Sequence, residues 1–157
     1  MHDVLSHSED ICRKFNSIDL HDSELISFAL LERESGDIGK AGDLSFRLKL
    51  LTDPKKHHFK RAELILRDCR ITKINIDLVE KGYCSGAILA NSCSADSELK
   101  RQIHRAYVSR EVMLARYEDD PLVEYVHFNI TLVPGGGEID ILAKDFKLEV
   151  EEKQDPD

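Results

Sequence analysis

Apolar and polar residues alternate along several stretches of the chain, which is the pattern of half-buried β-strands. The first stretch, residues 24–33, begins within a short polar segment at residues 20–25. Its large apolar side chains recur at every second position: Ile26, Phe28 and Leu30. A second stretch, residues 43–52, alternates in the same way after a glycine-rich break. These patterns predict a domain built mainly of sheet, with the polar segment at the entry to its first strand.

Further strands are predicted where short apolar runs end at turn residues. They cover residues 62–67, 71–79, 83–90 and 123–132, followed by one returning strand that carries Ile139, Ile141, Phe146, Leu148 and Val150. Three glycines at residues 135–137, directly after Pro134, predict a hairpin turn before the returning strand. A basic turn is expected at residues 55–61.

Helical spacing of apolar residues predicts two helices. One covers residues 2–16, and the other begins after Ser97, whose hydroxyl suits the N-cap position. Short connections between successive strands favour antiparallel pairing. The predicted fold is α+β: a meander-rich antiparallel sheet, curved or partly closed, with one or two helices packed on one face. Residues 1–150 are expected to form a single domain, and the acidic residues 151–157 are expected to be a disordered, dispensable tail.

Length and charge narrow the class of protein. The chain has 157 residues and a formal net charge of -8, which is enough length for one buried core. Its acidity argues against nucleic-acid binding, which depends on clustered Lys and Arg, and suits a basic protein partner. The sequence has no apolar run long enough for a membrane span and no secretory signal pattern, so a cytoplasmic location with four reduced cysteines is expected.

The polar segment carries the candidate chemistry. His21, Asp22, Ser23 and Glu24 include every side chain type of a hydrolytic triad, but neighbours along a chain cannot converge on one reacting atom. The favoured interpretation is a turn in which the side chain of Asp22 or Ser23 accepts hydrogen bonds from backbone N–H groups. The alternative interpretation gives His21 and Asp22 a binding or catalytic role. In that alternative, Tyr125 and His127 complete a binding site in the curved sheet. No catalytic residue, metal ligand or cofactor is assigned.

The polar segment also carries a resemblance. Residues 20–25, followed by an alternating strand and then by residues 44–50, resemble small uncharacterised bacterial domains that open with a His-Asp-Ser or His-Asp-Ala motif. Some of these domains are grouped with the immunity proteins of polymorphic toxin systems. The resemblance covers roughly the first half of the chain. It implies a bacterial, sheet-rich domain and no established chemistry.

The function predicted from these observations is non-enzymatic protein interaction, in the form of an immunity-like inhibitor that binds a basic toxin. One alternative is a small-ligand-binding or enzymatic α+β domain with a pocket in the curved sheet. Another is a homo-oligomer that associates through an uncovered sheet edge.

Overall fold

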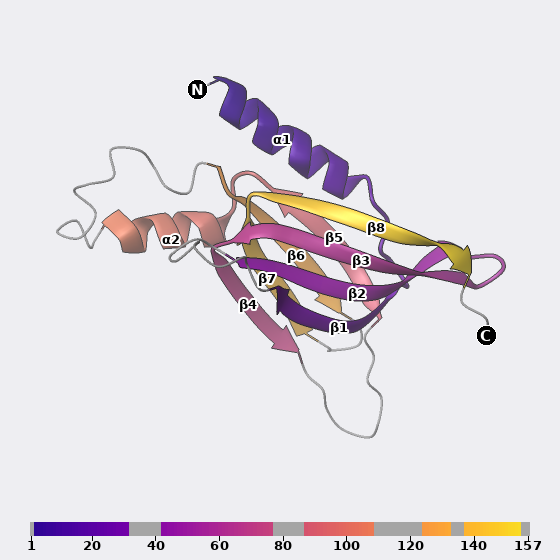
Figure 1. Ribbon diagram of the computed structural model, residues 1–157. Coiled ribbons are helices and arrows are strands. Elements are labelled where there is room, and N and C mark those ends of the chain that lie inside the picture. The colour runs from indigo at the N-terminus through magenta and orange to yellow at the C-terminus, as the bar shows by residue number, and fades with distance from the viewer. Residues whose placement is uncertain (1, 32–41, 77–86, 109–123, 133–136, 155–157) are drawn as a thin grey trace.

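The computed structural model describes residues 2–31, 42–76, 87–108, 124–132 and 137–154 (Figure 1). The elements, in chain order, are α1 (His2–Asn16), β1 (Glu24–Leu31), β2 (Gly42–Asp53), β3 (His58–Cys69), β4 (Ile71–Ile76), β5 (Ile88–Ser94), α2 (Glu98–Val108), β6 (Val126–Leu132), β7 (Gly137–Ala143) and β8 (Asp145–Gln154). Within these residues the strands form two four-stranded sheets. The first sheet has the order β1-β2-β3-β8, the second has the order β4-β7-β6-β5, and all pairs are antiparallel.

One long two-stranded ribbon contributes to both sheets. The β3–β8 pair continues directly into the β4–β7 pair, and the ribbon bends at Arg70 and Lys144. Two backbone hydrogen bonds cross the bend: Arg70 N–H donates to the Leu142 carbonyl at 2.8 Å, and Lys144 N–H donates to the Arg67 carbonyl at 2.9 Å. The prediction of a single curved or partly closed sheet is therefore corrected to two open sheets, mainly β with two helices, in the described residues. The predicted returning strand is likewise two strands, since residues on either side of Lys144 belong to different sheets.

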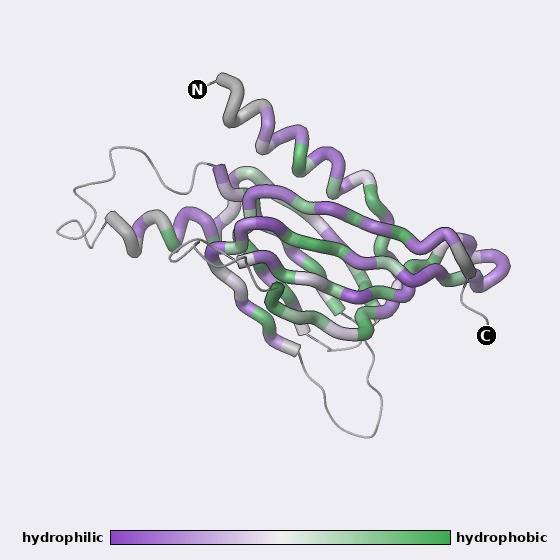
Figure 2. The backbone as a smooth tube through the Cα atoms, in the orientation of Figure 1, coloured by the Kyte–Doolittle hydropathy of each residue, from purple (hydrophilic) through white to green (hydrophobic). Residues whose placement is uncertain are grey.

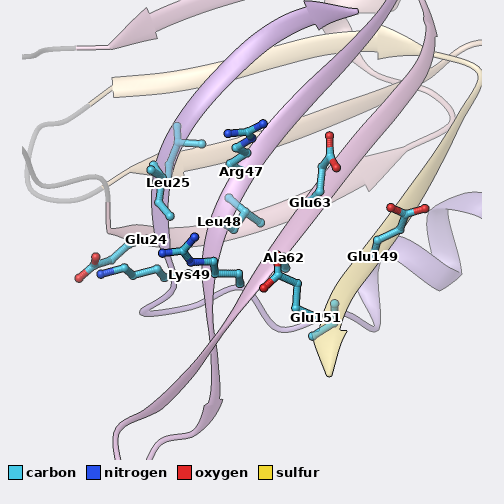
Figure 3. A pocket seen from close by; sticks show the side chains of 12 residues that line it. Glu24, Leu25, Arg47, Leu48, Lys49, Ala62, Glu63, Glu149 and Glu151 are labelled. Carbon is cyan, nitrogen blue, oxygen red and sulfur yellow. The ribbon is translucent and has the colours of Figure 1, made fainter. Parts of the chain in front are cut away.

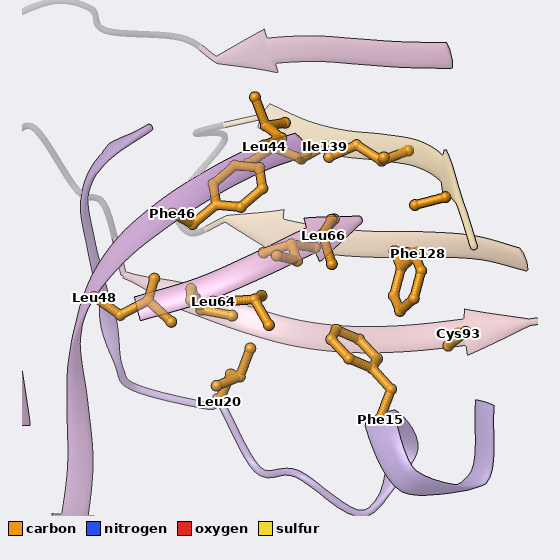
Figure 4. Close-up of a cluster of buried hydrophobic side chains, with 14 of the residues drawn as sticks. Phe15, Leu20, Leu44, Phe46, Leu48, Leu64, Leu66, Cys93, Phe128 and Ile139 are labelled. Atoms are coloured by element: carbon orange, nitrogen blue, oxygen red, sulfur yellow. The ribbon is translucent and has the colours of Figure 1, made fainter. Parts of the chain in front are cut away.

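The hydrophobic core lies between the two sheets (Figure 4). Alternation along the strands, visible in Figure 2, sends every second side chain inward. The largest fully buried side chains include Phe46, Leu64, Phe128 and Ile139. Phe15 of α1 is also fully buried, and its ring meets the ring of Phe128 edge to face at a centroid distance of 4.9 Å. The first helix thus contributes to the main core.

The second helix packs elsewhere. Ser97 is its N-cap as predicted, since Lys100 N–H donates to Ser97 Oγ at 3.1 Å. Leu99 and Ile103 pack against a small separate cluster formed by Tyr125 and Leu142. Leu142 alternates with core residues Ile139 and Ile141 along β7, so this cluster lies on the outer side of the second sheet. The sequence predicted that the helices would pack on one face of one sheet. In the structure, α1 packs into the main core, and α2 packs on the outer side of the second sheet.

Several predicted boundaries are corrected by the backbone pairing. β8 extends to Gln154, which pairs with Lys60, so residues 151–154 are strand and not tail; residues 155–157 lie outside the described residues. The prediction was wrong because it was based on the lack of apolar side chains in this segment, whereas pairing of two strands needs only backbone hydrogen-bonding groups. β3 begins at His58, within the predicted basic turn. β5 extends to Ser94, beyond the predicted end, and residues 83–86 are outside the described part of the chain. β6 and β7 pair as the predicted hairpin.

Candidate functional site

The polar segment forms a turn that connects the two sheets, with Leu20 and Ser23 buried and His21 and Asp22 exposed. Ser23 N–H donates to the Leu20 carbonyl at 3.0 Å, and Asp22 takes the left-handed conformation with φ of 63°. Asp22 N–H donates to the Ile88 carbonyl at 2.9 Å, and Ile88 N–H donates to the Ser23 carbonyl at 2.8 Å. The Ser23 side chain is fully buried, and its hydroxyl oxygen accepts a hydrogen bond from Leu51 N–H at 2.9 Å. This geometry matches the interpretation of the polar segment as a structural turn.

The side chains of His21 and Asp22 point into solvent. His21 Nδ1 lies 3.1 Å from Asp22 Oδ2, and both side chains are more than half exposed. The Asp22 carboxylate contacts this imidazole and not the backbone N–H groups of the turn, so Ser23 is the residue whose side chain supports the turn. An exposed pair of this kind contributes little to stability because water screens it.

The other two predicted binding residues lie on the outer side of the second sheet. His127 Nε2 is 2.6 Å from Asp140 Oδ1, and Asn129 Nδ2 donates to the same oxygen at 2.9 Å. Tyr125 is buried two residues before His127, with the Lys144 ammonium 5.5 Å from the centre of its ring. The structure thus brings Tyr125 and His127 to one face, where His127 belongs to a partly buried polar network around Asp140 and Tyr125 to the apolar cluster with Leu142.

The two halves of the predicted site are far apart. Ile88, which holds the turn at Asp22, pairs with Leu132 at one end of β6. His127 is five residues away at the other end of the strand, a distance of about 17 Å at 3.4 Å per residue. The predicted binding residues are therefore divided between two places, because alternation along a strand reveals a face and not a position along the sheet.

β1 presents an apolar surface that the sequence alone did not identify. Four of its large side chains are exposed: Ile26 by 52%, Phe28 by 46%, Leu30 by 76% and Leu31 by 37%. The strand is at the end of the first sheet and pairs with β2 on one side; within the described residues, its backbone pairing with the chain before β5 is the single Glu24–Ala87 bridge. Residues 25–31 include no charge and no proline, the features that normally protect an edge strand.

The edge at β5 is covered by the end of α1 and the segment that follows it. The Asn16 amide accepts from Cys93 N–H at 2.7 Å and donates to the Cys93 carbonyl at 3.0 Å. Asn91 accepts from Leu20 N–H at 3.2 Å and donates to the Ile18 carbonyl at 2.9 Å. Asn16 thus satisfies backbone groups of β5, and Asn91 on β5 satisfies backbone groups of the segment after α1, whereas β1 has no equivalent cover among the described residues.

A groove of about 860 Å³ lies beside β1 on the first sheet (Figure 3). Its charged side chains come from all four strands: Glu24, Arg47, Lys49, Arg61, Glu63, Glu149 and Glu151. Charges of both signs lie in rows across the strands: Arg47 is opposite Glu63, and Glu63 is opposite Glu149. Lys147 donates a hydrogen bond to Glu149 that holds the pKa of this carboxyl below its usual value. The groove is therefore a mixed-charge surface on the outer face of the first sheet, and Ile26 of β1 lines it, whereas Phe28 and Leu30 are opposite Phe46 and Leu44 on the core-facing side.

Comparisons with known proteins identify no relative of this chain. The chain matches no protein-family model, and no curated protein sequence or solved structure is significantly similar to it. Over the described ranges, no three His, Cys, Asp or Glu side chains are grouped in a way that could hold a metal ion. Neither described helix combines the length and apolar content required to cross a lipid bilayer.

Proposed function

We propose that this chain is a non-enzymatic protein-interaction module that binds a positively charged partner protein through β1 and the adjacent groove. The observation that carries the proposal is the exposure of Ile26, Phe28, Leu30 and Leu31 on one end strand. An extended segment of the partner adds to β1 as a further strand, with backbone hydrogen bonds supplying affinity and the exposed side chains supplying apolar contact.

Charge complementarity selects the partner. The chain has a formal net charge of -8, and Glu24 lies on β1 itself, beside the path that an added strand follows. A basic partner is attracted over distance by this net charge, and its association rate falls as salt increases. Inhibition of a basic bacterial toxin is the specific form of this function that the resemblance of the polar segment suggests.

The test combines capture with matched surface variants. The purified chain is used to isolate a basic partner from the native host at low salt, and the dissociation constant is then measured with both purified proteins. Leu30→Lys places a charge on the apolar surface of β1, and Leu89→Lys makes the same change at a side chain that is 47% exposed on β5. We expect Leu30→Lys to weaken binding by at least about 30-fold, the effect of losing an interface hot spot. Leu89→Lys is expected to bind like the wild type.

Two results would reject the proposal. If Leu30→Lys binds the partner as tightly as the wild type, β1 is not part of the interface. If the affinity does not change with salt concentration, the negative charge of the chain does not attract the partner. Light scattering of the chain alone tests a third possibility, which is self-association through β1. A dimer that Leu30→Lys dissociates would mean that a second copy, and not a basic partner, occupies β1.

A small-ligand or enzymatic function is the second candidate, and the His127–Asp140 pair is the observation that favours it. A carboxylate that orients an imidazole is the arrangement of many general bases. A small molecule that raises the melting temperature of the wild type and not of His127→Gln would support this candidate. Equal responses to every such molecule would assign His127 to the structure of the sheet.

A further inference from the structure

Two cysteines that are 81 positions apart in the sequence meet in the core. Cys12 on α1 and Cys93 on β5 have their Sγ atoms 3.0 Å apart, and both residues are buried. A disulfide requires a separation of about 2.05 Å, so the sulfurs need to approach by only about 1 Å. The third cysteine in the described residues, Cys69, is engaged differently, since its thiol contacts the Leu66 carbonyl at 3.3 Å.

The surrounding structure holds the two thiols opposite each other. The Asn16 amide binds both backbone groups of Cys93, one helical turn beyond Cys12 along α1. Phe15, buried in the core, fixes the same turn of the helix against Phe128. Because the end of α1 is attached to β5 at these points, the thiols are aligned by the fold and need no rearrangement of the sheet to meet.

We propose that Cys12 and Cys93 are a redox-modification site that forms a reversible disulfide and fastens α1 to β5. The oxidant is a small-molecule disulfide such as oxidised glutathione. One cysteine thiolate attacks it, releasing one small thiol and leaving a mixed disulfide, and the second cysteine then displaces the remaining small thiol. Two protein thiols and one small disulfide become one protein disulfide and two small thiols, so that two electrons pass from the protein to the oxidant.

Burial governs when this reaction occurs. It raises the pKa of both thiols, so the reactive thiolate is scarce while α1 lies on the sheet. Detachment of α1 exposes both groups to the oxidant, and the return of the helix closes the bond. The disulfide consequently records that α1 opened in an oxidising environment and then holds the helix in place.

The experiment uses the full chain incubated with oxidised glutathione, followed by alkylation of the remaining thiols. We expect the oxidised chain to carry two alkyl groups fewer than an untreated, fully alkylated control, and peptide mapping to join Cys12 to Cys93. The melting temperature should rise by about 10 °C and return to its starting value on reduction. Cys69→Ser should behave like the wild type, while Cys12→Ser and Cys93→Ala should show no increase on oxidation.

Three results would overturn the proposal. The first is recovery of both thiols after a treatment that fully oxidises a control dithiol peptide. The second is a linked peptide that contains Cys69 or Cys84 in place of Cys12 or Cys93. The third is a mapped Cys12–Cys93 bond that leaves the melting temperature unchanged or lower, since the bond would then not fasten α1 in its native position.

Discussion

Replacing Ser23 with alanine removes the hydroxyl that ties the polar segment to β2. Ser23 Oγ accepts a hydrogen bond from Leu51 N–H at 2.9 Å, and the Ser23 side chain is fully buried. Without it the Leu51 N–H loses its partner, which costs about 1–2 kcal/mol for a partly buried donor. A domain of this size loses about 2–4 °C of melting temperature per kcal/mol, so Ser23→Ala is expected to melt about 2–8 °C below the wild type.

The assay is thermal unfolding followed by circular dichroism, with two controls that differ in one respect each. Ser27→Ala makes the same change at an exposed serine on β1 and is expected to stay within about 0.5 kcal/mol of the wild type. Asp22→Asn keeps a side chain that tolerates the left-handed backbone and changes only an exposed contact with His21, so it is also expected to be neutral. If Ser23→Ala folds and has the same melting temperature as Ser27→Ala, the structural role of the polar segment is refuted. If Asp22→Asn is destabilised and Ser23→Ala is not, the Asp22 carboxylate supports the turn in place of the Ser23 hydroxyl.

Three further predictions concern the core, the carboxyl terminus and the buried thiols. Phe15→Ala should lower the free energy of unfolding by about 3–5 kcal/mol, measured by urea denaturation, because it leaves a cavity beside Phe128. Deleting residues 155–157 should leave the melting temperature unchanged, whereas deleting residues 151–154 as well should lower it by several degrees, about the effect of one or two kcal/mol of lost strand pairing. Burial raises the pKa of Cys12 above the value of about 8.5 expected in the unfolded chain, so the folded state holds that proton to a higher pH. Stability should therefore be retained below about pH 8.5 and decline above it, and urea midpoints across this range should decline less in Cys12→Ser.

Local features of the fold followed from the sequence. The helix at His2–Asn16, the N-cap at Ser97 and the β6–β7 hairpin each depend on residues close together in the chain. Apolar alternation likewise predicted the strands β1 and β2. What it did not predict is the division into two sheets, because the ribbon bends at Arg70 and Lys144, where no glycine or proline marks a turn.

The candidate surfaces were less accessible to sequence reasoning, because they depend on which strands are neighbours. The contact of His127 with Asp140 follows from the register of β6 against β7, and the contact of Cys12 with Cys93 follows from the docking of α1. The exposure of Leu30 follows from the position of β1 at the end of a sheet. The same alternating pattern would bury this side chain if β1 were a central strand.

Amide hydrogen exchange of β1 with and without the captured partner tests the central proposal most directly. If the partner adds a strand, the backbone N–H groups of residues 24–31 that point away from β2 become hydrogen-bonded and their exchange slows on binding. The Cys93 amide of β5, which already donates to Asn16 Oδ1, serves as the internal reference and should change little. Protection confined to the face around His127, with β1 exchanging as in the unbound chain, would contradict the proposal and direct attention to the outer side of the second sheet.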